Sequence, residues 1–385
     1  MKSSLQESRW RDFDWPLLVA ITLLCGISLL VLYSIDAAPG EATEWHQKFW
    51  FKQLLWCGIG YAAFFWVTRL NFQRVFDAAP YIYAGTLLLL LAVLFIGVKI
   101  NGQRCWIRLG PLGTLQPSEF AKLGTILLVA RILRPLGLQG LTWQQLALVA
   151  VVTLLPVVLT LQQPDTGTAL TFFPPVLVMI FLSGIAIRWV VGVSLAGLIL
   201  SPLLFVFLIE PRLKQYQRDR INVTWNAIFH PERLRDRQTR EGFGYQTLQS
   251  MIAVGSGGIL GRGFRGGTQS QGGFIPAHHS DFIASVIAEE FGLVGSLGVL
   301  ALLLFIILHS ANVAGCSRER FSMLVLAGHM TLLAFHVIVN FGMVVGLVPI
   351  IGIPLPLLSA GGSSLLMTLV SLGLVANVYE RRFTN

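Results

Sequence analysis

Long apolar runs alternate with short polar turns along most of the chain. Ten runs reach about the 20 mostly apolar residues that a helix needs to cross a lipid bilayer. They are 15–35, 49–68, 80–99, 117–134, 144–162, 167–185, 188–209, 282–308, 322–346 and 363–379. Prolines inside the fifth and sixth runs predict kinks, which packed neighbours tolerate within a membrane. The pattern predicts an all-α integral membrane protein, a ten-transmembrane-helix bundle.

The largest interruption lies between the seventh and eighth runs. Residues 210–281 are polar, basic and rich in glycine, and they end in His278-His-Ser-Asp281. We expect them to form a large loop within one polytopic membrane domain of residues 1–385. No internal repeat of the kind that would divide the chain is visible.

Composition supports a membrane protein. Hydrophobic residues make up 54% of the chain and charged residues only 12%, whereas soluble proteins carry about 25% charged residues. The polar start of the chain predicts no cleavable signal peptide. The four cysteines lack the spacing of a disulfide framework or a zinc site. They are Cys25, Cys57, Cys105 and Cys316.

The lysines and arginines at the ends of the runs predict the orientation, because cytoplasmic loops carry the excess. One side has twelve of them: Lys2, Arg9, Arg11, Arg69, Arg74, Arg131, Arg134, Arg188, Arg318, Arg320, Arg381 and Arg382. The other side has five in its short loops: Lys48, Lys52, Lys99, Arg104 and Arg108. We therefore expect both termini in the cytoplasm and the 210–281 loop outside.

The 210–281 loop is itself basic, with ten Lys or Arg against six Asp or Glu. Two interpretations stay open. The arginines contact anionic lipid headgroups, or they form a surface that binds pyrophosphate, since arginine pairs with phosphate oxygens bidentately. Nucleic acid is not expected as a partner of an extracellular loop.

Several polar groups fall inside the apolar runs, where charges are expensive and are candidates for function. Glu119 and Lys122 lie on one helix face and form either a structural ion pair or part of a substrate cavity. Asp165 is expected to cap a helix. Glu289 and Glu290 are expected about 12 Å below Asp281 on the same helix, in a hydrogen-bond network rather than a proton relay.

Asp281 is predicted at a helix N-terminus that faces water, where the helix dipole favours the ionised carboxylate. That carboxylate either caps the helix or accepts a proton from a hydroxyl nucleophile. The neighbouring His278 and His279 are either proton carriers or polar residues of the interface.

Eight segments in order carry a resemblance to a known family. They are Asn101-Gly…Trp106-Ile…Leu109-Gly, Gln116-Pro-Ser-Glu-Phe-Ala-Lys122, Gln163-Pro-Asp-Thr-Gly-Thr168, Gly244-Tyr-Gln…Gln249-Ser, Ala253-Val-Gly-Ser-Gly-Gly258, Gly267-Thr-Gln-Ser-Gln271, His279-Ser-Asp-Phe-Ile283 with Ala288-Glu-Glu290, and Pro354-Leu-Pro…Ser359-Ala-Gly-Gly-Ser363. On these segments the chain resembles the SEDS family (shape, elongation, division and sporulation), the RodA/FtsW-type peptidoglycan polymerases. The run Asn340-Phe-Gly-Met…Pro354-Leu-Pro356 is more similar to the RodA-like elongation enzymes than to the FtsW-like division enzymes.

The resemblance implies a peptidoglycan glycosyltransferase that polymerises lipid II into β-1,4 glycan strands at the outer face of the cytoplasmic (inner) membrane during cell elongation. Asp281 would be its general base in an inverting reaction with polyprenyl pyrophosphate as leaving group. A class B penicillin-binding protein, other elongation-complex membrane proteins and membrane lipid are the implied partners. A divalent cation, Mg²⁺ or Mn²⁺, is a candidate cofactor. Substrate-binding candidates are Glu119, Lys122, Arg104, Gln269, His279, Arg262 and Arg265.

Three positions depart from the family pattern: Cys105, Ala277 and Ala360 stand where the family usually has Arg, Glu and Tyr. Rival functions are a flippase or transporter of a lipid-linked cell-wall precursor, a non-catalytic scaffold, and the role of the division paralogue. A transporter would explain the charges within the runs but leaves the carboxylate of the loop unexplained.

Overall fold

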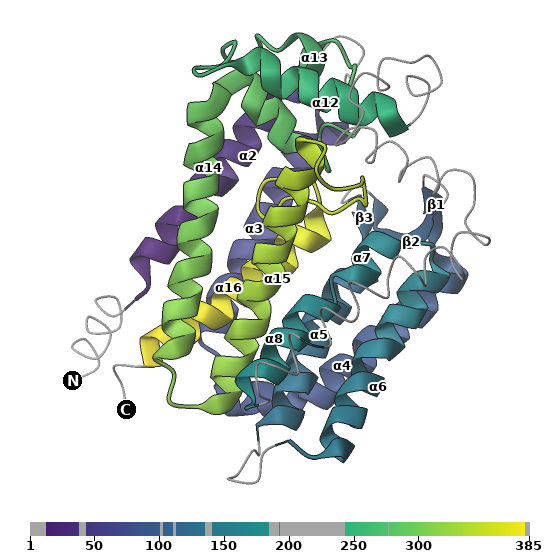
Figure 1. Ribbon diagram of the computed structural model, residues 1–385, viewed down its shortest axis with the longest axis vertical. Helices are drawn as coiled ribbons and strands as arrows, with labels where there is room; N and C mark the ends of the chain where they lie inside the picture. Colours follow the sequence, from purple (N-terminus) through teal and green to yellow (C-terminus); the bar gives the residue numbers. More distant parts are fainter. Residues whose placement is uncertain are drawn as a thin grey trace.

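The protein is a bundle of helices with one small sheet at one end (Figure 1). The computed structural model describes residues 13–37, 44–100, 103–110, 113–134, 141–184, 192, 243–275 and 277–381. The helices are α2 (Trp15–Ile35), α3 (Phe49–Thr68), α4 (Phe72–Ile96), α5 (Pro117–Leu133), α6 (Trp143–Gln162), α7 (Thr166–Leu170), α8 (Phe173–Leu182), α12 (Phe243–Gly257), α13 (Thr268–Gln271), α14 (Ile283–Gly315), α15 (Arg320–Val344) and α16 (Gly362–Arg381), with a 3₁₀ turn η1 (Trp45–Gln47).

Most of the expected runs are helices within a few residues. Six described helices are long and apolar enough to cross a membrane, namely α2, α4, α6, α14, α15 and α16. The apolar pattern therefore correctly predicted a multi-pass membrane protein. Apart from residue 192, the expected run 188–209 and the first part of the expected loop, up to residue 242, lie outside the described residues.

The all-α prediction is wrong at residues 98–115. Strands β1 (Val98–Ile100), β2 (Gln103–Arg108) and β3 (Thr114–Leu115) form an antiparallel sheet in the order β1-β2-β3. The third expected run was placed too late, because α4 already begins at Phe72 and ends before Gly97. The apolar residues after Gly97 belong to a hairpin, in which alternate side chains face opposite sides.

The sixth expected run is two helices rather than one. α7 ends at Leu170, and α8 begins at Phe173 with Pro174 and Pro175 in its first turn. Proline lacks the N–H that would continue the preceding hydrogen-bond ladder, but it fits the first turn of a new helix. The prolines thus mark a helix start where the sequence suggested a kink.

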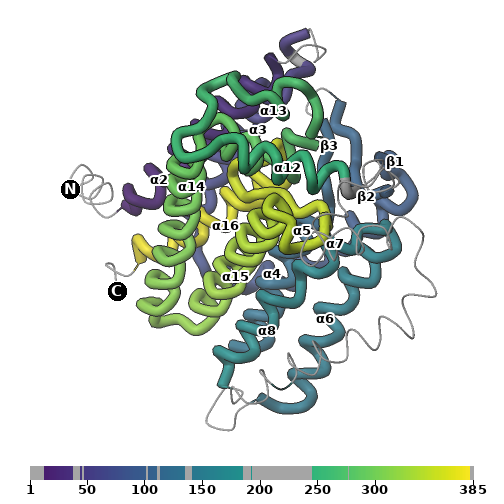
Figure 2. The backbone as a smooth tube through the Cα atoms, turned by 45° about the horizontal axis from the view of Figure 1, so that its top comes forward, coloured from purple at the N-terminus to yellow at the C-terminus, as the bar shows by residue number. Residues whose placement is uncertain are grey.

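The two ends of the bundle differ. α2 begins and α16 ends at the lower end in Figure 1, whereas α12, α13 and the sheet lie at the upper end. Contacts between distant residues confirm the lower end, since the His309 ring of α14 lies 2.7 Å from the Asp14 carboxylate that caps α2. Figure 2 shows α12 and α13 lying across the upper ends of α14 and α15.

α14 is two helical pieces joined at Gly292, whose φ of 68° and ψ of −161° are not helical. Residues 282–290 are all buried, whereas Leu293, Val294 and Leu297 are more than half exposed. A helix buried on all sides lies within a core, and one exposed apolar face is typical of a helix that meets lipid. The first piece therefore lies inside the bundle and the second on its outside.

The first piece of α14 rises from the turn 277–282 toward the upper end. The Ser359 hydroxyl donates to the Ser280 carbonyl of this turn, and the adjacent Leu358 carbonyl accepts a hydrogen bond from Ser28 of α2. Glu290 instead accepts from Ser34 of α2. Six residues of α2 correspond to about 9 Å of rise. Glu290 is thus nearer the upper end than the turn. The expectation of Glu289 and Glu290 below Asp281 is wrong, because the chain reverses at Gly292.

Gly292→Ala is expected to destabilise the protein. Its φ is one that non-glycine residues adopt at a cost of about 1–3 kcal/mol, and an added Cβ would overlap the backbone of Gly261 and Ile259. Gly298→Ala is the matched control, because an added Cβ there meets nothing within 4 Å. Thermal unfolding in detergent should show a lowered midpoint for the first variant alone. Equal midpoints for the two variants would contradict the kink.

Candidate functional site

The turn 277–282, which carries Asp281, is held from two sides. Asn340 of α15 donates its amide to the Asp281 carbonyl at 2.9 Å and to the Ile353 carbonyl at 2.8 Å. The Ser359 hydroxyl donates to the Ser280 carbonyl at 2.6 Å, and the Ala360 N–H donates to the His279 carbonyl at 2.9 Å. The backbone of the turn is therefore fixed by α15 and by the segment before α16.

The Asp281 side chain is partly exposed, and one of its carboxylate oxygens faces Gly352. A Cβ added to Gly352 would lie 3.6 Å from this oxygen, so the glycine keeps space beside the carboxylate. The N-cap of α14 is Phe282, and Asp281 lies one position earlier. Phe282 rather than Asp281 is therefore the N-cap residue, and Asp281 is a partly exposed residue on a rigid turn.

His278 and His279 are built into the turn differently. The His279 ring stacks on Phe49 of α3, with centroids 4.0 Å apart and planes at 13°. Burial, with a smaller contribution from His278, lowers the pKa of His279 to about 4, so its imidazole is neutral at pH 7. His278 Nδ1 lies 2.7 Å from the Ile275 carbonyl. Stacking and a backbone contact thus account for both rings.

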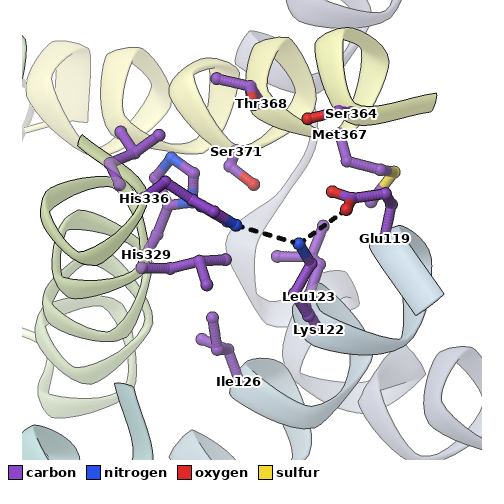
Figure 3. Close-up of a pocket in the computed structure, with 12 residues that line it drawn as sticks. Glu119, Lys122, Leu123, Ile126, His329, His336, Ser364, Met367, Thr368 and Ser371 are labelled. Carbon is purple, nitrogen blue, oxygen red and sulfur yellow. Dashed lines mark hydrogen bonds and ion pairs between the residues drawn. The ribbon is translucent and has the colours of Figure 1, made fainter. Parts of the chain in front are cut away.

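Glu119 and Lys122 form an ion pair inside the bundle (Figure 3). The Lys122 ammonium donates to Glu119 at 2.7 Å and lies 3.3 Å from Nε2 of His336. Because the ammonium is a donor, this ring nitrogen must be the acceptor. The structural ion pair is therefore present, and it lines a cavity of about 20 Å³ with His329, Thr368 and Ser371. That volume holds about one water molecule.

The cavity lies nearer the lower end than residues 277–282, which carry Asp281, by about one turn of α15. His336 and Asn340 are four residues apart on α15, which corresponds to about 6 Å along the helix. Asn340 holds the Asp281 carbonyl, and His336 contacts Lys122. The ion pair is therefore stacked beneath the site rather than beside the exposed carboxylate.

The expected cap at Asp165 is confirmed. Its carboxylate accepts from the Thr168 N–H at 3.0 Å at the start of α7. It also accepts from the Gln116 side chain at 3.0 Å, which ties α7 to the start of α5. Behind it, Gly167 packs so closely on the Ile351 carbonyl that no side chain fits. This contact joins α7 to the loop that faces Asp281.

Glu289 and Glu290 form the expected structural network at the upper end. Glu289 accepts from the N–H groups of Gln269 and Ser270 at 2.8 and 2.9 Å, at the start of α13. Glu290 accepts from the Ser34 hydroxyl. Gln269, expected to bind substrate, is thus attached to Glu289 through its backbone.

The three arginines expected to bind substrate do not converge. Arg104 of β2 is exposed and donates to the Leu94 carbonyl at 3.3 Å, while its neighbour Cys105 is fully buried. Arg262 donates to the Ser256 carbonyl at 3.2 Å, and Arg265 lies over the Tyr33 ring at 4.8 Å. Arg104 thus belongs to the sheet, and the other two belong to the loop beside Gly292.

Sequence reasoning missed Asn340, Ser359 and His336 as site residues. Asn340 and Ser359 stand in segments that carried the resemblance, but nothing local showed that they hold the turn of Asp281. A lone histidine in an apolar helix gave no signal of a partner in α5. Within the described ranges, no group of three or more His, Cys, Asp or Glu residues is placed to hold a metal ion.

Comparison with known proteins identifies the family. The FtsW/RodA/SpoVE family model, described as cell cycle protein, matches residues 15–383. Peptidoglycan glycosyltransferase RodA of Treponema pallidum is 32% identical, covering 96% of this chain and 98% of its own. Peptidoglycan glycosyltransferase MrdB of Escherichia coli is 38% identical over 80% of each chain. These names confirm the enzyme class expected from the sequence, a glycosyltransferase.

Solved structures agree over almost the full length. RodA of Thermus thermophilus, a rod shape determining protein, aligns with a TM-score of 0.69 and 30% identity, covering 97% of this chain and 98% of its own. A chain from a structure of a peptidoglycan synthase complex that coordinates polymerization and crosslinking aligns with a TM-score of 0.77 and 32% identity, covering 97% and 99%. The protein therefore belongs to the FtsW/RodA/SpoVE family of cell cycle proteins.

Proposed function

We propose that this protein polymerises lipid II into β-1,4 glycan strands, with Asp281 as general base. The observation that carries the proposal is the carboxylate of Asp281. It is partly exposed, and it lies on a turn that Asn340, Ser359 and Ala360 hold by the backbone. A base acts efficiently when its support is rigid, because misplacement by about 1 Å costs much of the rate.

The reaction is a single inverting displacement. Asp281 accepts the proton of the 4-hydroxyl of the acceptor N-acetylglucosamine. The hydroxyl oxygen forms a bond to the anomeric carbon of the donor N-acetylmuramic acid, and the bond from that carbon to the polyprenyl pyrophosphate breaks. The electron pair leaves with the pyrophosphate. One base suffices because the leaving group is already activated, unlike in hydrolases that need two carboxylates.

The departing pyrophosphate needs positive charge or donors nearby. Of the candidate cations, Lys122 is buried beneath the turn, so we assign this role to the exposed Arg104 on the sheet. The described residues do not form a metal site by themselves, since Asp281 is the one carboxylate on the turn. A divalent ion there would be held by Asp281 and the phosphates of the substrate, as Mg²⁺ commonly is.

The distribution of charge supports an orientation in the membrane. The upper end carries Asp281, α12 and α13, and the lower end carries Arg69, Arg131, Arg134, Arg318 and Arg381 near the helix ends. We therefore place the upper end at the outer face of the cytoplasmic membrane and both termini in the cytoplasm. An elongation role beside a class B penicillin-binding protein is supported by the RodA-like segments and by the similarity to a chain of a peptidoglycan synthase complex.

The purified protein in liposomes, given labelled lipid II, tests the function. We expect glycan strands, resolved by length on a gel, and parallel reactions with and without Mg²⁺ or Mn²⁺ test the metal. A flippase would instead move lipid II across the bilayer without forming polymer. A scaffold would do neither. Thermal unfolding must first show that the protein is folded. Transport without polymer, or neither transport nor polymer, from such folded protein would refute the proposal.

A further inference from the structure

The segment of residues 258–266, called the 258–266 loop below, packs against α14 where its two helical pieces meet. In an unbroken helix the N–H groups of Leu293 and Val294 would bond to the carbonyls of Glu289 and Glu290. Here Leu293 and Val294 instead donate to the carbonyls of Gly258 and Ile259, at 2.9 and 3.1 Å. In turn, the Glu289 and Glu290 carbonyls accept from the N–H groups of Arg262 and Gly263, at 2.9 and 3.0 Å. The loop therefore satisfies these four backbone groups beside the kink.

The outer side of the 258–266 loop is apolar. Ile259 and Leu260 are 69% and 80% exposed, and Phe264 is 46% exposed. Their backbone neighbours across the kink, Leu293 and Val294, are exposed as well. These side chains continue the exposed apolar face of the second piece of α14. The face that meets lipid thus extends onto the loop.

The depth of the 258–266 loop follows from the length of α14. From Leu293 to Gly315 the second piece rises about 33 Å, which matches a hydrocarbon core of about 30 Å. Leu293 is therefore at the upper boundary of the hydrocarbon. Non-helical backbone is tolerated at that level only when its polar groups are bonded within the protein, as they are here.

Two exposed arginines complete this surface. Arg262 and Arg265 flank Phe264, and the Arg265 guanidinium lies over the Tyr33 ring near the upper end of α2. Tyrosine at a helix end is typical of the headgroup region, and arginine pairs with phosphate bidentately. Apolar side chains facing the hydrocarbon with guanidinium groups beside them match the structure of a phospholipid at the interface.

We propose that the 258–266 loop is inserted into the edge of the bilayer, where Arg262 and Arg265 bind the phosphate of an anionic phospholipid. This surface is outside the bundle, whereas the turn of Asp281 is inside it. The inference is independent of the proposed polymerisation. Because the loop is bonded to both sides of the kink, bilayer contact also supports the first piece of α14, which leads to Asp281.

The lipid part is tested with the full chain in nanodiscs of phosphatidylglycerol or phosphatidylcholine, with bound lipid counted by native mass spectrometry. We expect retained phosphatidylglycerol, and a loss of preference by about fivefold for each of Arg262→Gln and Arg265→Gln. Arg108→Gln, an exposed arginine of β2 at the same end, is the matched control and should keep the preference. Equal binding of phosphatidylglycerol by wild type and by the double variant Arg262→Gln/Arg265→Gln would overturn the proposal.

A second measurement tests insertion and the other source of phosphate. A spin label at Leu260→Cys should collide with oxygen and be shielded from a water-soluble nickel complex, like a label at the exposed Leu308 of α14. If the label at residue 260 were as accessible to the nickel complex as a label in water, the proposed insertion would be overturned. If the arginine variants instead lose affinity for a polyprenyl pyrophosphate while retaining phosphatidylglycerol, the arginines belong to the substrate site and the proposal fails.

Discussion

Asp281→Asn is expected to reduce polymerisation of lipid II by about 10²–10⁴-fold, because a general base contributes about that factor. Asparagine keeps the shape of the side chain and removes its ability to accept the proton. The hydrogen bonds that hold the turn use the backbone of Asp281 and of its neighbours, so the fold should persist. The measurement is the initial rate of glycan synthesis by purified protein in liposomes.

The control for this prediction is Asp77→Asn, an exposed carboxylate of α4 near the lower end. It changes the same charge far from the turn and should leave the rate near that of wild type. Thermal unfolding must show that both variants are folded. Unchanged synthesis by the Asp281 variant would rule out the role of a base.

Lys122→Met is expected to destabilise the protein by about 3–5 kcal/mol, because it leaves the buried Glu119 without its cation. The side chains of Lys122 and Glu119 are only 2% and 7% exposed, so bulk solvent does not replace the lost partner. The His336 ring also loses the donor that lies 3.3 Å from it. Thermal unfolding in detergent should show a markedly lowered midpoint.

The double variant Glu119→Leu/Lys122→Met removes both charges, so it distinguishes loss of the ion pair from the cost of leaving one buried charge unpaired. Removing both charges of a buried pair is often close to neutral, so much of the stability should return. Lys99→Met, at an exposed lysine of β1, should have little effect. If Lys122→Met were as stable as wild type, the pair would not be buried as described. If the stable double variant still lost activity, the charges would serve the substrate as well as the fold.

Local pattern was sufficient for the helices of the bundle. α2 and α3 begin and end where the apolar runs do, because a segment in lipid must satisfy its backbone internally. The cap at Asp165 was also local, since it needs only its own next turn. The hairpin after α4 was missed because β1 has only three residues, two of them apolar, and follows the apolar end of α4 without a visible boundary.

The Asp281 site was predicted only in part. Its motif drew attention to the carboxylate, but its rigidity depends on Asn340 and Ser359, which are 59 and 78 residues away in sequence. The ion pair of Glu119 and Lys122 was predicted from helical spacing. His336, which contacts Lys122, is 214 residues further along the chain, so no local pattern indicated this contact.

The sequence by itself determined that the chain is a membrane protein, where most of its helices lie and which carboxylate stands at the edge of the polar insert. Hydrophobicity, helix period and capping act over a few residues, so a linear reading captures them. Only the tertiary structure decided that α14 reverses at Gly292, that Asp281 is recessed below Glu290 and that the 258–266 loop covers the break. Each depends on backbone hydrogen bonds exchanged between distant segments, and those partners exist only once the bundle has packed.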